Sequence, residues 1–447
     1  MPSFDEILQS LLPDIIGLRR ELHRIPERAW SETKTQTAIL SFLERHGCKP
    51  RKAGGTGLLV DVPAVPDMPY GPVAPCDPHS PGRAPGYSPV PAAAGAPARP
   101  RRIAVRADLD ALPVTEQTGL AFASEHAGIM HACGHDMHMA AVAGLSAILT
   151  AVMAKAPSGS TNSLPGGGAV RFIFQPAEEG SAVKADLDDL LKPRPRGRRG
   201  AQVMMDQGAV RDVDAIVGLH CWPDLPAGTV GVDPKIAMAG NASLYIRIRG
   251  KGGHGATPHK TIDPVPVAAT LILALQTIAS RRSNPSNPFV LSVCSMHAGT
   301  TGNVIPDRAE LIATLRSSTP GFLDKEMPAM LDDMVNGIAK AFGAEAEMAY
   351  SPGLPPVVND AALVQQFVKS ATRALGEGKA VVLDEAAMTS EDYAYYSEEV
   401  PGVYVKVGVA GAGGSAPLHS PVFNPEESAL ATAIKAIGAF IYDYLEH

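Results

Sequence analysis

The sequence has few cysteines and no excess of basic residues. Its 447 residues include five cysteines, Cys48, Cys76, Cys133, Cys221 and Cys294, which are odd in number and widely spaced. This pattern argues against a disulfide framework. The simplest explanation is a reducing compartment, the cytoplasm, in which a functional cysteine acts as a thiolate. Lys and Arg total 39 against 46 Asp and Glu, a net charge of −7, which argues against a nucleic-acid-binding protein.

Long hydrophobic runs are also lacking. The longest, residues 140–154, is broken by Ser146 and Thr150 and is shorter than the roughly 20 residues that a membrane span needs, so we expect a buried helix and no membrane association. The N-terminal residues do not combine a basic segment with an apolar one, so no secretory signal is expected. Hydrophobic residues make up 45% of the chain, enough to build a large core, and the length allows two or three domains.

Two segments differ in composition from the rest of the chain. Residues 63–100 contain twelve prolines, which excludes core packing and predicts an exposed loop insertion; a peptide-recognition role is the alternative. Residues 192–199, Lys-Pro-Arg-Pro-Arg-Gly-Arg-Arg, carry five positive charges among turn-forming residues. We expect a solvated loop there, with a small site for an anionic partner as the alternative.

The remaining sequence predicts an α/β fold. Apolar spacing indicates helix over residues 14–47, interrupted at Pro26, and a long helix after His138. Short apolar runs predict strands at 58–62, 103–106, 169–174 and 214–219. Because strands alternate with helices, we expect a central, mostly parallel sheet.

A second unit is predicted within the α/β domain. Its expected strands are 243–249, 289–295, 310–316 and 344–350, and its expected helices are 266–280 and 323–342. The order β-α-β-β-α-β is typical of a ferredoxin-like α+β unit. A strand at 402–408 and a helix at 426–445 then return to the first domain. The predicted division is therefore 1–240 for the first part of a catalytic domain, 241–352 for the inserted unit, and 353–447 for the second part.

The densest group of potential ligands is His131-Ala-Cys133-Gly-His135-Asp136-Met-His138, in which five of eight residues can bind a metal. The glycine between Cys133 and His135 allows a tight turn, so that both side chains can face one ion. The alternative is a set of capping and orienting groups, since Asp136 could cap the following helix.

Three further segments complete a possible metal site. Glu178 and Glu179 follow an apolar strand, and neighbouring carboxylates in a loop point in different directions, so one can hold a metal while the other moves a proton. His220 follows another predicted strand, and His419 lies before the last helix. An exposed acidic turn and two structural histidines are the alternatives.

The motifs run in order over nearly the full chain: Arg20–Glu27, Arg106–Pro113, His131–His138, Gln175–Gly180, Gly252–His254, Asn303–Pro306, Ser390–Asp392 and Leu418–Ser420. Together they resemble the M20 family of metallopeptidases, in particular its amidohydrolases, which include hippurate hydrolase, N-acyl-amino-acid amidohydrolases (aminoacylases) and auxin-conjugate hydrolases. Residues 63–100 and 181–200 are longer than the family pattern.

The resemblance implies a binuclear site. It assigns two divalent ions, manganese or zinc with cobalt as a further option, to five ligands: Cys133, His135, Glu179, His220 and His419. It assigns the general base to Glu178, which would take a proton from the attacking water and pass it to the leaving amine.

The resemblance also implies supporting residues. Asp108 and Asp110 would orient the ligands, with capping of the next turn as the alternative. His254, in the inserted unit, would donate a hydrogen bond to the oxyanion, within the chain or across a homodimer built on that unit, which would act as a lid. Asn303 and Arg316 are candidates for binding the substrate carboxylate, although an arginine at a strand end is usually solvated.

The predicted function is hydrolysis of the amide bond of N-acyl amino acids or similar small conjugates. The alternatives are a dipeptidase, carboxypeptidase or N-carbamoylase with the same site, and a catalytically silent binding protein with the same fold.

Overall fold

The computed structural model describes residues 3–63, 100–154, 164–180, 187–191 and 198–446. The predicted proline-rich loop at 63–100 and the predicted basic loop at 192–199 lie mostly outside these described residues.

The largest element is an eight-stranded sheet in the order β1-β2-β4-β3-β5-β16-β6-β15. Its strands are β1 (Pro50–Ala53), β2 (Gly57–Val62), β3 (Arg102–Asp108), β4 (Ala169–Gln175), β5 (Ala215–Pro226), β6 (Val230–Val232), β15 (Ala380–Val382) and β16 (Gly402–Ala410). The four central strands β4, β3, β5 and β16 are mutually parallel. The predicted mostly parallel sheet is thus confirmed.

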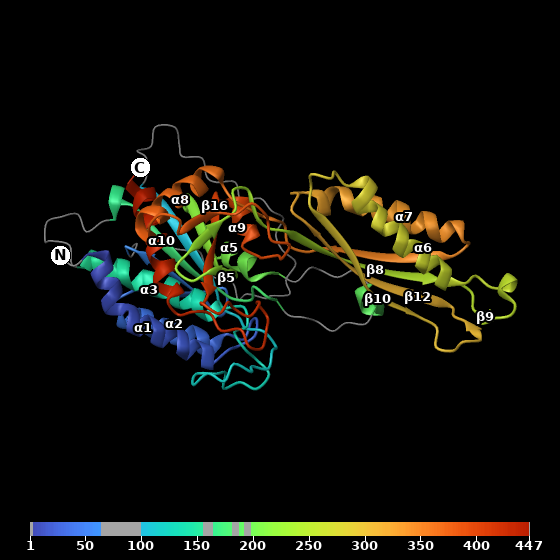
Figure 1. The fold of residues 1–447 in the computed structure, drawn as a ribbon, viewed down its shortest axis with the longest axis horizontal. Helices are drawn as coiled ribbons and strands as arrows, with labels where there is room; N and C mark the ends of the chain where they lie inside the picture. Colours follow the sequence, from blue (N-terminus) through green and yellow to red (C-terminus); the bar gives the residue numbers. More distant parts are fainter. Residues whose placement is uncertain (1–2, 64–99, 155–163, 181–186, 192–197, 447) are drawn as a thin grey trace.

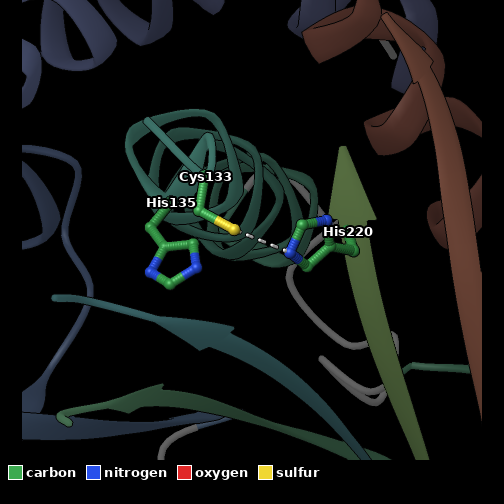
Figure 2. Close-up of side chains that lie close together, drawn as sticks. All are labelled: Cys133, His135 and His220. Atoms are coloured by element: carbon green, nitrogen blue, oxygen red, sulfur yellow. Dashed lines mark hydrogen bonds between the residues drawn. The ribbon is translucent and has the colours of Figure 1, made fainter. Parts of the chain in front are cut away.

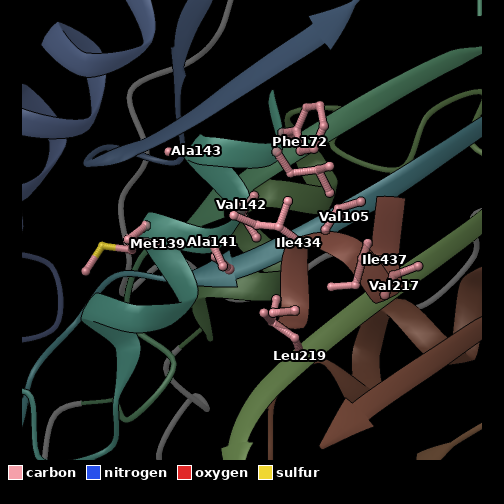
Figure 3. Close-up of a cluster of buried hydrophobic side chains, with 14 of the residues drawn as sticks. Val105, Met139, Ala141, Val142, Ala143, Phe172, Val217, Leu219, Ile434 and Ile437 are labelled. Carbon is pink, nitrogen blue, oxygen red and sulfur yellow. The ribbon is translucent and has the colours of Figure 1, made fainter. Parts of the chain in front are cut away.

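Helices cover both faces of this sheet. One face packs against α1 (Phe4–Arg24), α2 (Thr33–Arg45), α3 (His135–Ala154), α8 (Ala361–Leu375) and α10 (Ala429–Glu446). Figure 3 shows this core, where strand residues such as Val105, Phe172 and Val217 meet Val142 of α3 and Ile434 of α10. The other face packs against α5 (Gly200–Asp206) and α9 (Ala394–Glu399). The result is a three-layer α/β/α domain.

The long apolar helix predicted from the sequence is α3. Helix α3 is long and apolar enough to cross a membrane by length and composition, but 72% of its most apolar window is buried inside the molecule. The prediction of a buried core helix is therefore confirmed. The segment Pro264–Arg282 passes the same test with only 33% of its window buried.

Three predicted boundaries were wrong. Helix α1 begins at Phe4, because Ser3 and Glu6 form a capping box there. Helix α3 begins at His135 instead of after His138, since the turn at Gly134, with φ 84°, already directs the chain into the helix. Strand β5 continues to Pro226 because it stays paired with β16, so His220 lies within a strand.

A second sheet of four antiparallel strands has the order β10-β12-β8-β13. Its elements are β8 (Gly240–Arg249), α6 (Pro264–Thr277), β10 (Phe289–Ala298), β12 (Arg308–Ser317), α7 (Met327–Ala341) and β13 (Glu345–Pro352). The two helices bury their apolar sides on one face of the sheet and form a separate core. The connectivity and strand order confirm the predicted ferredoxin-like arrangement.

The molecule is elongated, with the three-layer domain at one end and the second sheet at the other (Figure 1). The chain enters the second sheet at Gly240, where β8 starts, and leaves it after Pro352, where β13 ends. The short strands β9 (Gly253–His254) and β11 (Val304–Ile305) pair at the end of this unit that is remote from the three-layer domain.

Candidate metal centre

The predicted ligands gather at one edge of the large sheet. Strands β3 and β4 end at this edge with Asp108 and Gln175, and the turn that follows β4 carries Glu178 and Glu179. Helix α3 begins there with His135, and the loop before α10 supplies His419. The carboxyl ends of parallel strands are the usual location of sites in open α/β sheets.

Cys133, His135 and His220 form the buried part of the site. Figure 2 shows the thiol of Cys133 pointing from the start of α3 toward the ring of His220 on β5, with Sγ and Nε2 3.4 Å apart. The potential ligand atoms of all three residues lie within 4.8 Å of one another. All three side chains are buried.

Both buried histidines are oriented for ligation through Nε2. Nδ1 of His135 lies 2.8 Å from the carbonyl oxygen of Asp110, and Nδ1 of His220 lies 2.8 Å from that of Cys221. Since a carbonyl only accepts, each Nδ1 carries a proton, and in the neutral ring Nε2 is then the nitrogen whose lone pair can bind a metal. Within the described part of the chain, the buried Nε2 of His135 has no hydrogen-bond partner. This arrangement matches a metal-ligating histidine held by a carbonyl.

Two further groups of potential ligands extend the site toward solvent. Cys133, Glu179 and His419 form one, and His135, Glu178 and Glu179 form the other, each with ligand atoms within 4.8 Å. Nε2 of His419 lies 3.3 Å from Oε1 of Glu179. Because the groups share members, the structure brings all five predicted ligands and Glu178 into one site.

The surroundings of Cys133 also fit a cation. Burial, together with the charges of Glu179 and Glu178, raises the pKa of the Cys133 thiol well above its ordinary value. A thiolate in such an acidic, buried position requires a nearby positive charge. A divalent ion among these thiol, imidazole and carboxylate groups would supply that charge.

The environments of Glu178 and Glu179 differ. Burial and the nearby Glu391 and Glu179 raise the pKa of Glu178 well above its ordinary value. Burial alone would raise the pKa of Glu179, but the hydrogen bond from His419 and the charge of His135 lower it. Two titratable groups whose pKa values are pushed apart are typical of a pair with different chemical tasks.

His135 and His220 also differ in their electrostatic surroundings. Burial acts to lower the pKa of His135, but Asp108 and Asp110 outweigh it and raise that pKa to about 10. Burial and the neighbouring His138 lower the pKa of His220 to about 4. The negative charges of Asp108 and Asp110 therefore act more strongly on His135 than on His220.

Asp110 and Asp108 support different parts of the site. The carboxylate of Asp110 accepts hydrogen bonds from the backbone amides of Glu178 and Glu179, both at 3.0 Å. Asp108 accepts from Nδ1 of His138 at 2.6 Å, and Nε2 of His138 in turn accepts from the amide of Cys221 at 2.8 Å. His138 therefore uses both ring nitrogens within the protein and connects Asp108 to the strand that carries His220.

The structure does not bring His254 to the metal site within one chain. His254 is exposed on β9, at the remote end of the second sheet. Its Nδ1 accepts a hydrogen bond from the amide of Ala256 at 3.0 Å, so Nε2 carries the proton in the neutral ring. The backbone carbonyl of Asn303 accepts from the amide of Gly255 at 2.9 Å, which places Asn303 beside His254.

Arg316 lies at the opposite end of the same sheet. In the antiparallel register of β12 and β8 it lies opposite Asn241, at the start of β8, where the chain arrives from the first domain. Its Nη1 donates to the Thr314 hydroxyl at 2.6 Å and to the Leu315 carbonyl at 2.9 Å. Arg308, at the other end of β12, is eight residues away, which corresponds to roughly 27 Å along a strand.

Several site residues were not assigned a role from the sequence. Arg106 is fully buried and contacts Gln175 at 2.9 Å, Asp108 at 2.7 Å, Asp392 at 2.8 Å and Glu391 at 3.0 Å. A charged residue inside an apolar strand, as in Ile103-Ala-Val-Arg106, was the available signal, because such a charge is buried only when it is paired. Glu32, described below, gave no such signal.

His131 was counted among the potential ligands but is absent from the groups described above. It is buried, and neither of its ring nitrogens has a hydrogen-bond partner among the described residues. Burial lowers its pKa to about 3, so the ring stays neutral.

Comparisons with known proteins agree with this geometry. The family described as Peptidase family M20/M25/M40 matches residues 104–443. An N-acetylcysteine deacetylase of Bacillus subtilis (strain 168) is 35% identical over 423 residues, covering 94% of this chain and 93% of that protein. An N-acetyldiaminopimelate deacetylase of Streptococcus uberis is 33% identical over 443 residues, covering 97% of this chain and 99% of that protein.

A solved structure shows the same relationship. The YXEP protein of Bacillus subtilis, described as a dinuclear metal binding peptidase from the M20 family, matches with a TM-score of 0.72 and 32% identity over 98% of this chain and 99% of that one. The chain therefore belongs to peptidase family M20/M25/M40, as its motifs predicted, and is a metal-dependent hydrolase of amide bonds.

Proposed function

We propose that this protein is a binuclear amidohydrolase that removes the acyl group from N-acyl amino acids or similar small conjugates. The observation that carries the proposal is the convergence of six side chains from four separate segments. They are Cys133, His135, Glu178, Glu179, His220 and His419. The deacetylase relatives support a small N-acyl amino acid as the substrate.

In this proposal, five of these residues hold two divalent ions: Cys133, His135, Glu179, His220 and His419. When bound, such ions lower the pKa of a water molecule and polarise the substrate carbonyl. The thiol and imidazole ligands favour zinc, whereas the carboxylate and imidazole ligands also suit manganese, and cobalt can replace either.

Glu178 is the proposed general base. It lies beside the ligand Glu179 but belongs to a group with Glu391 and Asp392, whose carboxylate oxygens lie within 4.8 Å of its own. We infer that it takes the proton from the attacking water and delivers it to the nitrogen of the leaving amine. The substrate approaches from the side of His419, whose side chain is 54% exposed while the other histidine ligands are buried.

A homodimer built on the second sheet would explain where the remaining candidates lie. His254 and Asn303 lie at one end of this sheet and Arg316 at the other, too far apart to contact one small substrate in the same chain. We infer that the inserted unit is a lid and dimerisation domain, and that each site receives His254 and Asn303 from the partner chain and Arg316 from its own.

The surface of the second unit supports this assembly. Strand β10 is an edge strand of its sheet, and edge strands are available for pairing with another chain. The neighbouring helix α6 exposes apolar residues, including Leu273, which is 72% exposed, and Val265. Exposed apolar side chains beside an unpaired strand edge support a subunit interface at this surface.

We also place the enzyme in a reducing compartment such as the cytoplasm. The four cysteines among the described residues, Cys48, Cys133, Cys221 and Cys294, are free thiols. A reduced Cys133 is what the proposed ligand set requires.

The test is elemental analysis of purified, unsupplemented protein followed by kinetics on N-acetyl, N-benzoyl, dipeptide and N-carbamoyl substrates. The proposal predicts about two divalent ions per chain and the highest kcat/KM for an N-acyl amino acid. A preference for dipeptides or N-carbamoyl compounds would identify one of the alternative hydrolases. Protein that contains no metal and hydrolyses none of the four classes would contradict the enzymatic assignment.

A further inference from the structure

The turn that carries Glu178 and Glu179 contains a strained residue. Ala177 has φ 54°, in the left-handed region that residues with a side chain rarely adopt. Such a conformation is unfavourable and persists only where the surroundings enforce it. The contacts that enforce it therefore determine where the two glutamate side chains point.

Two buried carboxylates hold this turn through three consecutive backbone amides. The amide of Ala177 donates to Oε1 of Glu32 at 2.9 Å, and the amides of Glu178 and Glu179 donate to the two oxygens of Asp110, both at 3.0 Å. Asp110 follows β3, whereas Glu32 immediately precedes α2. The turn is thus fixed from two separate parts of the chain.

Glu32 does not have the usual role of an acidic residue at a helix start. It occupies the N-cap position of α2, but its side chain makes no capping hydrogen bond. Glu27 caps this helix instead, because its carboxylate accepts from the amide of Thr35 at 2.9 Å and from the Thr35 hydroxyl at 3.0 Å. The carboxylate of Glu32 is therefore free to reach the catalytic turn.

The second oxygen of Glu32 anchors it to another turn. Oε2 accepts from the Thr56 hydroxyl at 2.6 Å, in the turn between β1 and β2. Gln36, one helical turn further along α2, donates to the carbonyl of Gly57 at 3.0 Å. Glu32 and Gln36 lie on the same face of the helix, so α2 holds the β1–β2 turn while Glu32 links it to Ala177.

The burial of Glu32 is unfavourable for stability alone. Its side chain is 0% exposed, and no ion pair to it occurs within the residues that the structure describes. Burial and the neighbouring Asp110 raise its pKa to about 7. A buried carboxyl group without a cationic partner is costly, so a role in the site accounts for its presence better than a role in packing.

We propose that Glu32 is a positioning residue for the hydrolytic reaction, which with Asp110 fixes the turn 176–179 so that Glu178 faces the reacting water and Glu179 faces the metal ligands. The inference rests on the proposed function. Glu32 touches neither the substrate nor the ligands; it acts through the Ala177 amide. A displacement of about 1 Å in a catalytic group can lower the rate by about 100-fold.

The experiment compares Glu32→Gln with Glu32→Asp. Glutamine keeps the length of the side chain, an acceptor for the Ala177 amide and a donor for the Thr56 oxygen, but it removes the charge. Aspartate keeps the charge but is one methylene shorter, so it cannot reach both Ala177 and Thr56. We expect Glu32→Gln to retain kcat within about threefold and Glu32→Asp to lose between about tenfold and 100-fold in kcat, with KM and metal content nearly unchanged in both.

Glu27→Ala is the matched control. It removes a carboxylate from the same loop and the side-chain cap of α2, so it should lower the melting temperature and leave kcat unchanged. A loss of kcat in Glu27→Ala equal to that in Glu32→Asp would mean that any disturbance of this loop lowers activity, which would overturn a specific role for Glu32.

Other outcomes would also overturn the inference. If Glu32→Asp is fully active while Glu32→Gln is not, the charge and not the position matters. If the loss of kcat follows a loss of metal, Glu32 acts on the metal centre instead of the base. Thr56→Val, which removes only the second anchor, gives the same test through a milder change if Glu32→Asp does not fold: an unchanged kcat would contradict the inference.

Glu178→Gln, measured in parallel, separates this inference from the proposed function. If Glu178→Gln is inactive and Glu32→Asp is normal, only the role of Glu32 is wrong. If Glu178→Gln keeps full turnover, the proposed base is wrong whatever the Glu32 variants do.

Discussion

The most direct test of the site is Glu178→Gln. Glutamine preserves the size of the side chain, and the backbone amide of residue 178 can still donate to Asp110, so the turn should keep its shape. The amide cannot accept the proton of the attacking water. General acid–base catalysis is worth about 10²–10⁴-fold, and the proposed base acts twice in each cycle, so kcat should fall by at least about 10²-fold.

The substitution should not weaken the fold. Glu178 is only 7% exposed, and the carboxylates of Glu391 and Asp392 lie within 4.8 Å of its own. Removing one negative charge from this group relieves repulsion between like charges. We therefore expect an unchanged or higher melting temperature for the metal-free variant, which would separate a loss of catalysis from a loss of structure.

The assay measures bound metal, KM and kcat for Glu178→Gln, Glu179→Gln and Cys133→Ser with the same N-acyl amino acid. Glu178→Gln should keep about two ions per chain, whereas the other two variants should lose one ion or exchange it readily, because they remove a ligand. Loss of metal in Glu178→Gln with retention in Glu179→Gln would show that the two roles are exchanged. Normal turnover in Glu178→Gln would refute the proton-transfer role.

Further predictions concern the metal, the insertion, the dimer and pH. Chelation should abolish activity, and Mn(II), Zn(II) or Co(II) should restore it; full activity of metal-free protein would exclude the binuclear site. Deletion of residues 64–99 with the ends joined should leave metal content unchanged, and an unfolded product would show that this segment is structural. His254→Ala should lower kcat without changing metal content, and mixing it with Arg316→Ala should restore roughly a quarter of the wild-type activity by random pairing into dimers; no recovery would contradict sharing between chains. The pKa of Glu32 rises from 4.5 to about 7 on folding, so the metal-free protein should lose stability as pH rises through that interval and regain it as pH falls. Glutamine does not titrate, so the unfolding free energy of Glu32→Gln should gain about 3 kcal/mol relative to wild type between pH 4 and pH 8. A constant difference would show that Glu32 does not titrate there.

The group of potential ligands that the fold brings together could be predicted because its members lie in short local motifs. Cys133, His135 and the pair Glu178 and Glu179 stand next to one another or around one glycine in the sequence, and a turn after a strand can be inferred from composition. The ferredoxin-like unit was predictable for a similar reason. Its strands and helices can be recognised from local patterns, and their order β-α-β-β-α-β is typical of the ferredoxin-like arrangement.

The boundaries of elements were less predictable because tertiary pairing determines them. His220 was expected after a strand, but pairing between β5 and β16 extends the strand to Pro226. Helix α3 was expected after His138, yet it begins at His135, which places a proposed ligand at the first residue of a helix. The local sequence preferences of a segment carry no information about the partner strand or the preceding turn that determines where its helix or strand begins and ends.

The sequence by itself determined which residue types can hold two ions and carry a proton, since those depend on side-chain chemistry and short spacing. Only the tertiary structure showed what holds those residues in place. Arg106 joins β3 to the loop that carries Glu391 and Asp392, and Glu32 reaches Ala177 from 145 positions earlier in the chain. The tertiary structure also placed His254 far from the site that it was expected to serve. These relations depend on which distant segments the fold makes neighbours, and no local pattern in the sequence encodes that.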